Sequence, residues 1–361
     1  DGHHTPEHWP IPLGISRGET IERRLFDAPQ DSLPLPGNRW VHLNPGALGF
    51  YRVHYDDELY RRLREAFPGL PSADRWSILQ DLFSFLLSGD ASRDLYYGFL
   101  DASRQANEHL IVHEIANQLS STIPGRHPTA LGALLGDEPD FRRHALLWLS
   151  SEMARLGLAE RAGEPEVAAV LRGRVASSLA PLDRDFARGL ARRYAEYRSV
   201  APDLRWPVLF SYASLGGASE HDELLRALRA APDEGDALRL ERSLARFPDP
   251  ALVARTLDLA LAPPFNRAHL QAVVREAALN PAGRTAVWEW IRSTMHTVEP
   301  EYKGTSVIAD ILKFALPYAA LGRRSEAEAE LSERPFAEGK RGALEGLAML
   351  GIYERFLAGG G

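Results

Sequence analysis

From about Asp57 to its end, the chain repeats the hydrophobic period of an amphipathic helix and is broken at short intervals by proline and glycine. Trp76, Leu79, Phe83 and Leu86, for example, recur at i, i+3, i+7 and i+10, which places them on one helix face. Because proline halts a helix interior and glycine ends many helices, these breaks predict separate helices of roughly 10 to 20 residues.

Short links join these predicted helices, and about two of them fit in every 30 to 45 residues, which is typical of stacked antiparallel pairs. No strict sequence repeat accompanies the pattern. We therefore predict a mainly α fold, an irregular HEAT/armadillo-like α-superhelix. The segments expected to be helical after residue 140 are 141–156, 165–179, 184–198, 203–215, 219–230, 236–247, 250–261, 268–278, 282–296, 305–317 and 338–357.

The first 56 residues differ, because proline and glycine separate short runs with the alternation of strands. Strands are expected at 9–15, 20–26, 39–43 and 50–55, the first at a sheet edge because its prolines cannot donate to a ladder. So few strands make a marginal core. The predicted organisation is a small, partial β-sandwich domain at 1–56 followed by an α-helical superhelical domain at 57–361.

Composition excludes several classes of function. A net charge of -7 and a pI near 6.0 give no electrostatic footprint for nucleic acid. No run of 18 apolar residues is present, so no membrane span is expected. The chain has 0 cysteines, which excludes disulfides and thiolate chemistry, and this usage favours a reducing, cytoplasmic location.

The segment around His113 is the nearest approach to a metal motif. His109 and His113 share a helix face at i, i+4, but Glu114 lies about 100° round the helix from His113, and no third ligand is visible nearby. Catalytic zinc needs three protein ligands, so we expect a solvent-facing or interdomain helix surface here and no bound cofactor in this chain. Trp288 and Trp290, which could stack on a ligand, are expected in the core.

Three stretches, in order along the chain, carry a family resemblance. The first fits the pattern W-x-x-x-N-x-x-x-x-G-[FY]-Y-R-V-x-Y, and the second resembles D-R-x-x-L-x-x-D-x-F. Together they resemble the zinc aminopeptidases of the aminopeptidase N type, in which the first pattern closes a small β-sandwich before a C-terminal helical domain. The matching segments are 40–55, 72–84 and the pieces of 240–291 that include Phe247-Pro248-Asp249-Pro250, Asn280-Pro281-Ala282-Gly283-Arg284 and Trp288-Glu289-Trp290-Ile291.

The resemblance implies a non-catalytic region of such an enzyme. The family binds zinc through H-E-x-x-H and a further Glu, and this chain contains no H-E-x-x-H. Its start would cut into the sandwich, and the zinc site would lie in a missing N-terminal catalytic domain. The implied role is a wall or cap that controls peptide access, in a parent enzyme that removes N-terminal amino acids. The implied partners are that domain and peptide substrates. A free-standing helical-repeat scaffold that binds a protein partner is the alternative, and an upstream H-E-x-x-H would decide between them.

Six residues are candidates for the surface that faces peptide or the peptidase domain. Arginine is the plausible peptide contact, because its planar fork binds a carboxylate bidentately. The alternative is structural: Asn280 caps a helix, and Arg267 and Arg284 pair with acids such as Glu276 and Glu289. By the resemblance, the candidates are Glu108, His109, His113, Arg267, Asn280 and Arg284.

Overall fold

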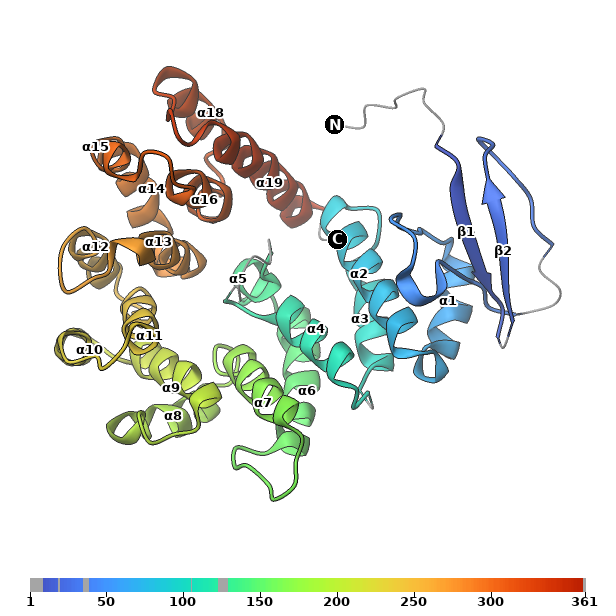
Figure 1. Cartoon of the computed structure of the whole chain (residues 1–361), viewed down its shortest axis with the longest axis horizontal. Helices are drawn as coiled ribbons and strands as arrows, with labels where there is room; N and C mark the ends of the chain where they lie inside the picture. The colour runs from blue at the N-terminus through green and yellow to red at the C-terminus, as the bar shows by residue number, and fades with distance from the viewer. Residues whose placement is uncertain (1–8, 19, 35–38, 105, 123–128, 360–361) are drawn as a thin grey trace. The chain divides into compact units, whose positions relative to one another are not determined.

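The computed structural model describes residues 9–18, 20–34, 39–104, 106–122 and 129–359. The chain forms two compact units, Asp1–Ile115 and Ala116–Gly361. The mainly α fold with a small β part at its start is confirmed, and all strands of the described residues lie before Tyr60 (Figure 1). Secondary structure changes near residue 56, as expected, whereas the units divide inside a helix: packing joins the first helices to the sheet.

The sheet contains β1 (Ile11–Ser16), β2 (Ile21–Phe26) and β3 (His42–Leu43) in the order β2-β1-β3. β1 pairs antiparallel with β2 along its whole length, from Ile11 opposite Phe26 to Ser16 opposite Ile21. Placing β1 at the edge was wrong, because β3 pairs with its other side. That second pairing reaches only Ile15 and Ser16, so Pro12 lies where β1 has one free side, which satisfies the restriction on proline.

The strand predicted at 50–55 is wrong. Tyr51, Val53 and Tyr55 are less exposed than their neighbours, as the alternation requires, but the segment joins no ladder. Its polar groups contact side chains: the Val53 N–H donates to Asp81 Oδ2 at 3.0 Å, and the Tyr55 hydroxyl accepts from the Leu43 N–H at 2.8 Å. The alternation was therefore read correctly as one buried face, but it does not specify a strand partner.

The first unit continues with α1 (Asp57–Ala66), the 3₁₀ helix η2 (Phe67–Gly69), α2 (Ser72–Ser88) and α3 (Arg93–Ala102). α4 (His109–Leu119) starts in the first unit and ends in the second. Asp56 caps α1 by accepting from the Leu59 N–H at 2.7 Å. Gly89, at φ 89°, ends α2 in the left-handed conformation.

The helices predicted after residue 140 are present with small shifts. The helix predicted at 184–198 is shorter than expected, because α8 ends at Ala191. A 3₁₀ helix follows, and its Tyr194 stacks on Tyr212. Segment 305–317 divides before Pro317, which has no N–H to donate. The helices are α5 (Leu131–Leu135), α6 (Pro139–Leu156), α7 (Glu166–Leu179), α8 (Arg184–Ala191), α9 (Pro202–Leu215), α10 (Ala218–Arg229), α11 (Glu234–Leu244), α12 (Pro250–Leu259), α13 (Leu270–Leu279), α14 (Arg284–Ser293), α15 (Met295–Val298), α16 (Val307–Phe314), α17 (Leu316–Ala319), α18 (Arg324–Glu333) and α19 (Lys340–Ala358).

Within the second unit the helices stack as pairs in two rows. The inner row is α7, α9, α11, α13, α16 and α19, and each of these helices packs on the next. Helices of an outer row pack on it: α6 on α7, α8 on α9, α10 on α11, α12 on α13 and α18 on α19. Figure 1 shows the rows following an arc, with α5 on its inner side. Stacked pairs present one side chain row per helix on the inner surface.

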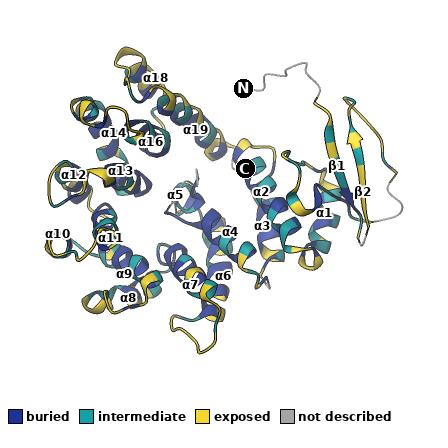
Figure 2. Ribbon diagram, viewed as in Figure 1, coloured by how far each residue is buried: buried dark blue, intermediate teal, exposed yellow. Residues whose placement is uncertain are grey.

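The helices of both rows carry buried residues (Figure 2), most of which are apolar. Trp288 and Trp290 are buried, which confirms their expected place in the core. The acidic face of α18 stays largely exposed. Among the described residues, no helix is long and apolar enough to cross a membrane.

Candidate functional site

Five arginines of the second unit form one group, four of them on or just after inner-row helices and one on α14. Arg174 lies on α7, Arg242 on α11, Arg275 on α13 and Arg284 at the start of α14, while Arg246 follows the end of α11. Each of the first three helices brings its arginine from the row in which neighbours pack directly on one another. We call this set the arginine cluster.

Glu276 of α13 is the buried acid at its centre. Arg242 donates to Glu276 Oε2 through Nη2 at 2.7 Å and through Nε at 3.2 Å. Arg246 places Nη1 3.4 Å from the other oxygen, Oε1. Asp137 and Asp310 act on single members at the edge, on Arg284 and Arg275 respectively. Inside the cluster, therefore, the Glu276 carboxylate pairs with Arg242 and Arg246, and its charge also acts on Arg275.

Two aromatic rings of α9 contact guanidinium groups of the cluster. The guanidinium of Arg242 lies 4.2 Å from the Trp206 ring centroid, and that of Arg246 lies 4.6 Å from the Phe210 centroid. Trp206 and Phe210 are four residues apart, and so are Arg242 and Arg246. The second arginine–aromatic pair therefore lies about one helical turn after the first. Cation–π contacts of this kind stabilise a desolvated arginine by about 0.5 to 2 kcal/mol.

Burial and mutual repulsion both act on the charges. Burial and, to a smaller extent, the Arg242 charge together lower the pKa of Arg174 to about 10. The pKa of Arg246 is lowered mainly by burial; Glu276 opposes this shift, whereas Arg242 and Arg284 add to it. The pKa of Arg275 is also lowered, by burial and then by Arg242. The groups stay protonated at neutral pH, but an added anion would relieve the repulsion between them.

Several donors of the cluster are buried and lack a hydrogen-bond acceptor within the described part of the chain: Nε of Arg174 and Arg284, and Nε and Nη1 of Arg246. Arg246 is 7% exposed, whereas the Arg242 side chain keeps 19% of its surface exposed. Buried guanidinium donors without acceptors are costly unless an anion binds them. This arrangement can bind a carboxylate through charge-assisted hydrogen bonds.

The three candidate residues of the second unit, Arg267, Asn280 and Arg284, have different surroundings. Arg284 belongs to the arginine cluster and donates to the Ala133 carbonyl, not to Glu289. Arg267 is 53% exposed on the 3₁₀ helix η4 (Arg267–His269) and pairs with Glu301, not with Glu276. Asn280 caps the 3₁₀ helix η5 (Pro281–Gly283) and donates to two main-chain carbonyls, so the expected cap is present.

The other three candidates lie in the first unit. Glu108 forms an ion pair with buried Arg75. The His109 and His113 rings are 6.4 Å apart, centroid to centroid, at the start of α4. Glu114 points elsewhere, because it accepts from Trp76 Nε1 at 3.3 Å.

Zinc, the metal that the resemblance implies for the family, does not fit these residues. Within the described ranges, no group of three or more His, Cys, Asp or Glu side chains could hold a metal ion. The histidine pair of α4 offers two ligands, and the carboxylate next to it in sequence is held away by the indole N–H. Three protein ligands are needed for a catalytic zinc site.

Sequence reasoning missed Arg174, Arg242, Arg246 and Arg275. One signal was available, because Arg242 and Arg246 share a helix face at i, i+4 and so do Trp206 and Phe210 on the preceding inner-row helix. Nothing in the sequence joins Arg174 to Arg284 across more than a hundred residues. Packing of successive helix pairs brings them together.

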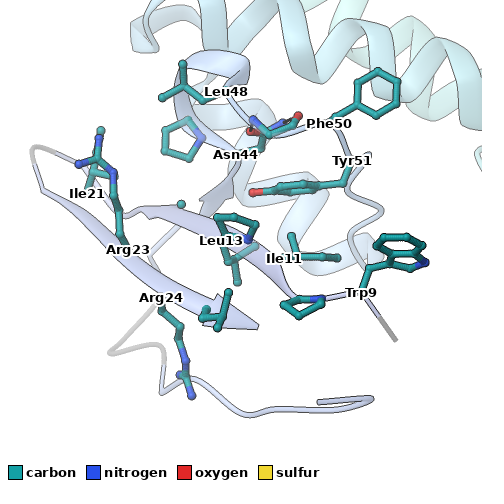
Figure 3. Close-up of a pocket in the computed structure, with 16 residues that line it drawn as sticks. Trp9, Ile11, Leu13, Ile21, Arg23, Arg24, Asn44, Leu48, Phe50 and Tyr51 are labelled. Atoms are coloured by element: carbon teal, nitrogen blue, oxygen red, sulfur yellow. Dashed lines mark hydrogen bonds between the residues drawn. The ribbon is translucent and has the colours of Figure 1, made fainter. Parts of the chain in front are cut away.

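A second feature is an apolar hollow on the sheet of the first unit, with a volume of about 970 Å³. Figure 3 shows Tyr51 lying over the sheet beside Leu13 and Ile11, with Phe50 turned away and Trp9 at one end. Trp9, Leu48 and Phe50 are strongly exposed for apolar residues. An exposed apolar patch of this kind marks an interaction surface and offers no catalytic group.

Comparison with known proteins assigns this sequence to a family. A family model described as the ERAP1-like C-terminal domain matches residues 40–350, and the chain belongs to this family. The resemblance to the C-terminal region of aminopeptidase N type enzymes is therefore confirmed.

Its relatives include aminopeptidases. The chain is 27% identical to the tricorn protease-interacting factor F2 of Thermoplasma acidophilum, over 98% of the chain and 43% of that protein. It is also 27% identical to a leucyl aminopeptidase of Saccharolobus solfataricus, over 96% of the chain and 42% of the relative. With aminopeptidase M1-A of Oryza sativa it shares 25% identity, over 82% of the chain and 35% of the relative. The chain thus spans less than half the length of these relatives.

Proposed function

We propose that this chain is the non-catalytic C-terminal region of a zinc-dependent aminopeptidase. Its inner helical surface limits the access of peptides to a zinc site in an N-terminal catalytic domain and binds their carboxyl ends. The arginine cluster is the observation that carries the proposal. Two features support it: the chain matches the ERAP1-like C-terminal domain and relatives that are named aminopeptidases, and buried guanidinium donors of the cluster lack hydrogen-bond acceptors in the described part of the chain.

The chemistry of a peptide end fits the cluster. A free peptide has one group that every substrate shares at the end opposite to the cleaved bond, the α-carboxylate. Guanidinium groups bind carboxylates in bidentate geometry, and partly desolvated pairs are stronger than exposed ones. Arg242, whose side chain is 19% exposed, makes the first contact, while the more deeply buried Arg246 adds positive potential.

The sheet of the first unit has a different part in the proposal. The catalytic domain, or the rest of the β-sandwich, covers the apolar hollow lined by Trp9, Leu48, Phe50 and Tyr51. Covering exposed apolar area stabilises by about 25 cal/mol per Å², which favours a permanent interdomain contact at this surface.

Direct binding tests the role of the cluster. A fluorescein-labelled nine-residue peptide of Gly, Ala and Ser is titrated with the chain, once with a free carboxyl end and once amidated. We expect the free acid to bind at least tenfold more tightly than the amide. Arg242→Gln removes this preference because it removes the partly exposed positive charge of the cluster, whereas Arg267→Ala, at an exposed pair elsewhere, keeps it.

Equal affinity for acid and amide in the unaltered chain contradicts the proposal. In the full-length protein, with its upstream region, the corresponding readout is kinetic. Arg242→Gln should raise KM for peptides of several residues and leave aminoacyl anilides nearly unchanged, because an anilide has no distant carboxylate. An upstream region without H-E-x-x-H would favour a protein-binding scaffold instead.

A further inference from the structure

A short segment of the second unit, residues 129–135, lies on the inner side of the arc and is held by helices far away in sequence (Figure 1). Thr129 Oγ1 is 3.0 Å from the Tyr353 hydroxyl of α19. The Ala130 N–H donates to the Tyr318 hydroxyl of α17 at 3.0 Å, and Arg284 of α14 donates to the Ala133 carbonyl. The last two contacts join residues that are 188 and 151 positions apart in the sequence.

Two of these contacts are to the main chain. Tyr318 accepts from a backbone N–H, and Arg284 donates to a backbone carbonyl, so neither depends on the side chain of the bound residue. Ala130 itself is extended, at φ -120° and ψ 105°. The two tyrosine hydroxyls are 3.2 Å apart and are completely buried. A peptide that is extended at the residue facing Tyr318 and turns into a helix toward the residue facing Arg284 could make the same two main-chain contacts.

The segment cannot hold this position by itself. α5 has five residues, too few for a stable isolated helix, and Ala130 makes no side-chain cap. On its other side, Gly132 donates to the Ser120 carbonyl at 2.9 Å, and a Cβ there would be 2.7 Å from the Leu119 carbonyl oxygen. Leu131 and Leu135 are buried. The segment is thus clamped between the end of α4 and the inner surface by contacts that can open locally.

We propose that Tyr318, Tyr353 and Arg284 form a binding site for a peptide main chain, and that residues 129–135 occupy this site as an internal ligand. An external peptide binds there only when the segment moves away, so the segment is autoinhibitory. The choice of a peptide as ligand rests on the proposed function, whereas the internal occupancy rests on the three contacts alone.

Releasing the segment tests the proposal. Leu131→Ala combined with Leu135→Ala weakens its docking and leaves Tyr318, Tyr353 and Arg284 intact. Gly132→Ala acts independently, by a clash with the end of α4. The probe is a fluorescein-labelled peptide copy of residues 129–135, Thr-Ala-Leu-Gly-Ala-Leu-Leu, amidated at its end. A second, unrelated amidated peptide of Gly, Ala and Ser serves as competitor.

We expect both variants to bind the copy at least tenfold more tightly than the unaltered chain, because the fraction of open sites limits the apparent affinity. Adding Tyr318→Phe should reverse the gain, and the competitor should displace the copy. Hydrogen exchange at residues 130–135 should accelerate in the variants, while α9 and α11 stay protected. Leu225→Ala, a buried leucine of α10, is the matched control and should lower Tm without any gain in binding.

A loss of Tm in both variants with no gain in copy binding overturns the proposal, because the segment is then ordinary core. Binding of the copy that the unrelated peptide fails to displace also overturns it, since the site would then recognise side chains. The probes carry no free carboxylate and the variants spare Arg242. A failure here is therefore distinguishable from a failure of the carboxylate test.

Discussion

The surface of α1 and the arginine cluster contain the same residue types in opposite surroundings. On α1, Arg61 bonds Glu58 at 2.7 Å and Glu65 at 2.6 Å, and all three side chains are about half exposed. In the cluster, Arg246 and its neighbours share one buried acid, Glu276. The α1 pairs are neutralised locally by their i, i+3 and i, i+4 spacing, whereas the cluster keeps an excess of positive charge inside the fold.

The difference shows which arginines can bind something else. Exposed pairs exchange water for a neighbour and stabilise little. A buried excess of one sign is costly, and it persists where a ligand or a functional requirement compensates. In a chain with 42 Lys and Arg against 49 Asp and Glu, a group of five arginines that includes the buried ion pairs of Glu276 is therefore informative.

The largest expected effect is the loss of the central acid. Glu276→Gln leaves Arg242 and Arg246 without their buried counter-charge, which should lower the free energy of unfolding by about 3 to 5 kcal/mol. Denaturant unfolding measures it. The matched change on α1, Glu58→Gln, should leave the midpoint nearly unchanged. Similar midpoints for the two variants would show that burial does not distinguish the two regions.

A buried histidine of the second unit gives the next effect. His221 of α10 is completely buried, and burial, followed by the Arg255 charge, lowers its pKa from 6.5 to about 4. Between these values the unfolded chain binds a proton that the folded chain does not. Stability should therefore fall by about 2 to 3 kcal/mol as the pH drops from 7 to 4. His221→Gln should flatten this part of the pH profile, and an unchanged slope would assign the acid sensitivity to other groups.

Anion binding gives a smaller effect. Sulfate compared with chloride at equal ionic strength should stabilise the unaltered chain by on the order of 1 kcal/mol, because it binds the folded cluster and not the unfolded chain. Thermal unfolding measures the difference. Arg242→Gln should abolish it, and Arg61→Gln should retain it. Equal stabilisation in the three proteins would indicate a general salt effect.

The smallest effect is expected at the other arginine that the sequence singled out. Arg267 pairs with Glu301 and lies 5.6 Å from the Tyr302 ring centroid, on an exposed surface. Arg267→Ala should change the free energy of unfolding by about 0 to 1 kcal/mol and leave sulfate stabilisation intact. A loss of the sulfate effect would place Arg267 in the binding surface after all.

The helices could be predicted from the sequence because the information is local. Hydrophobic period, caps such as Asp56 and stops such as Gly89 specify one helix at a time. The pairing of strands could not be predicted from the sequence. Residues 50–55 alternate like a strand, but the Val53 N–H donates to the Asp81 side chain and not to another strand. The cluster is non-local for the same reason: Arg174 and Arg242 meet only after α7, α9 and α11 have packed.

The contact of Thr129 with Tyr353 joins residues 224 positions apart, near the first and last helices of the second unit. A stack in which each pair touches only its neighbours can fray from either end, because its stability is a sum of adjacent interfaces. The Thr129–Tyr353 contact links the last helix directly to a segment near the start of the unit, in addition to the interfaces between neighbouring helices. The terminal helix α19 then cannot detach without also breaking its contact with Thr129, so fraying of α19 and release of residues 129–135 should be coupled.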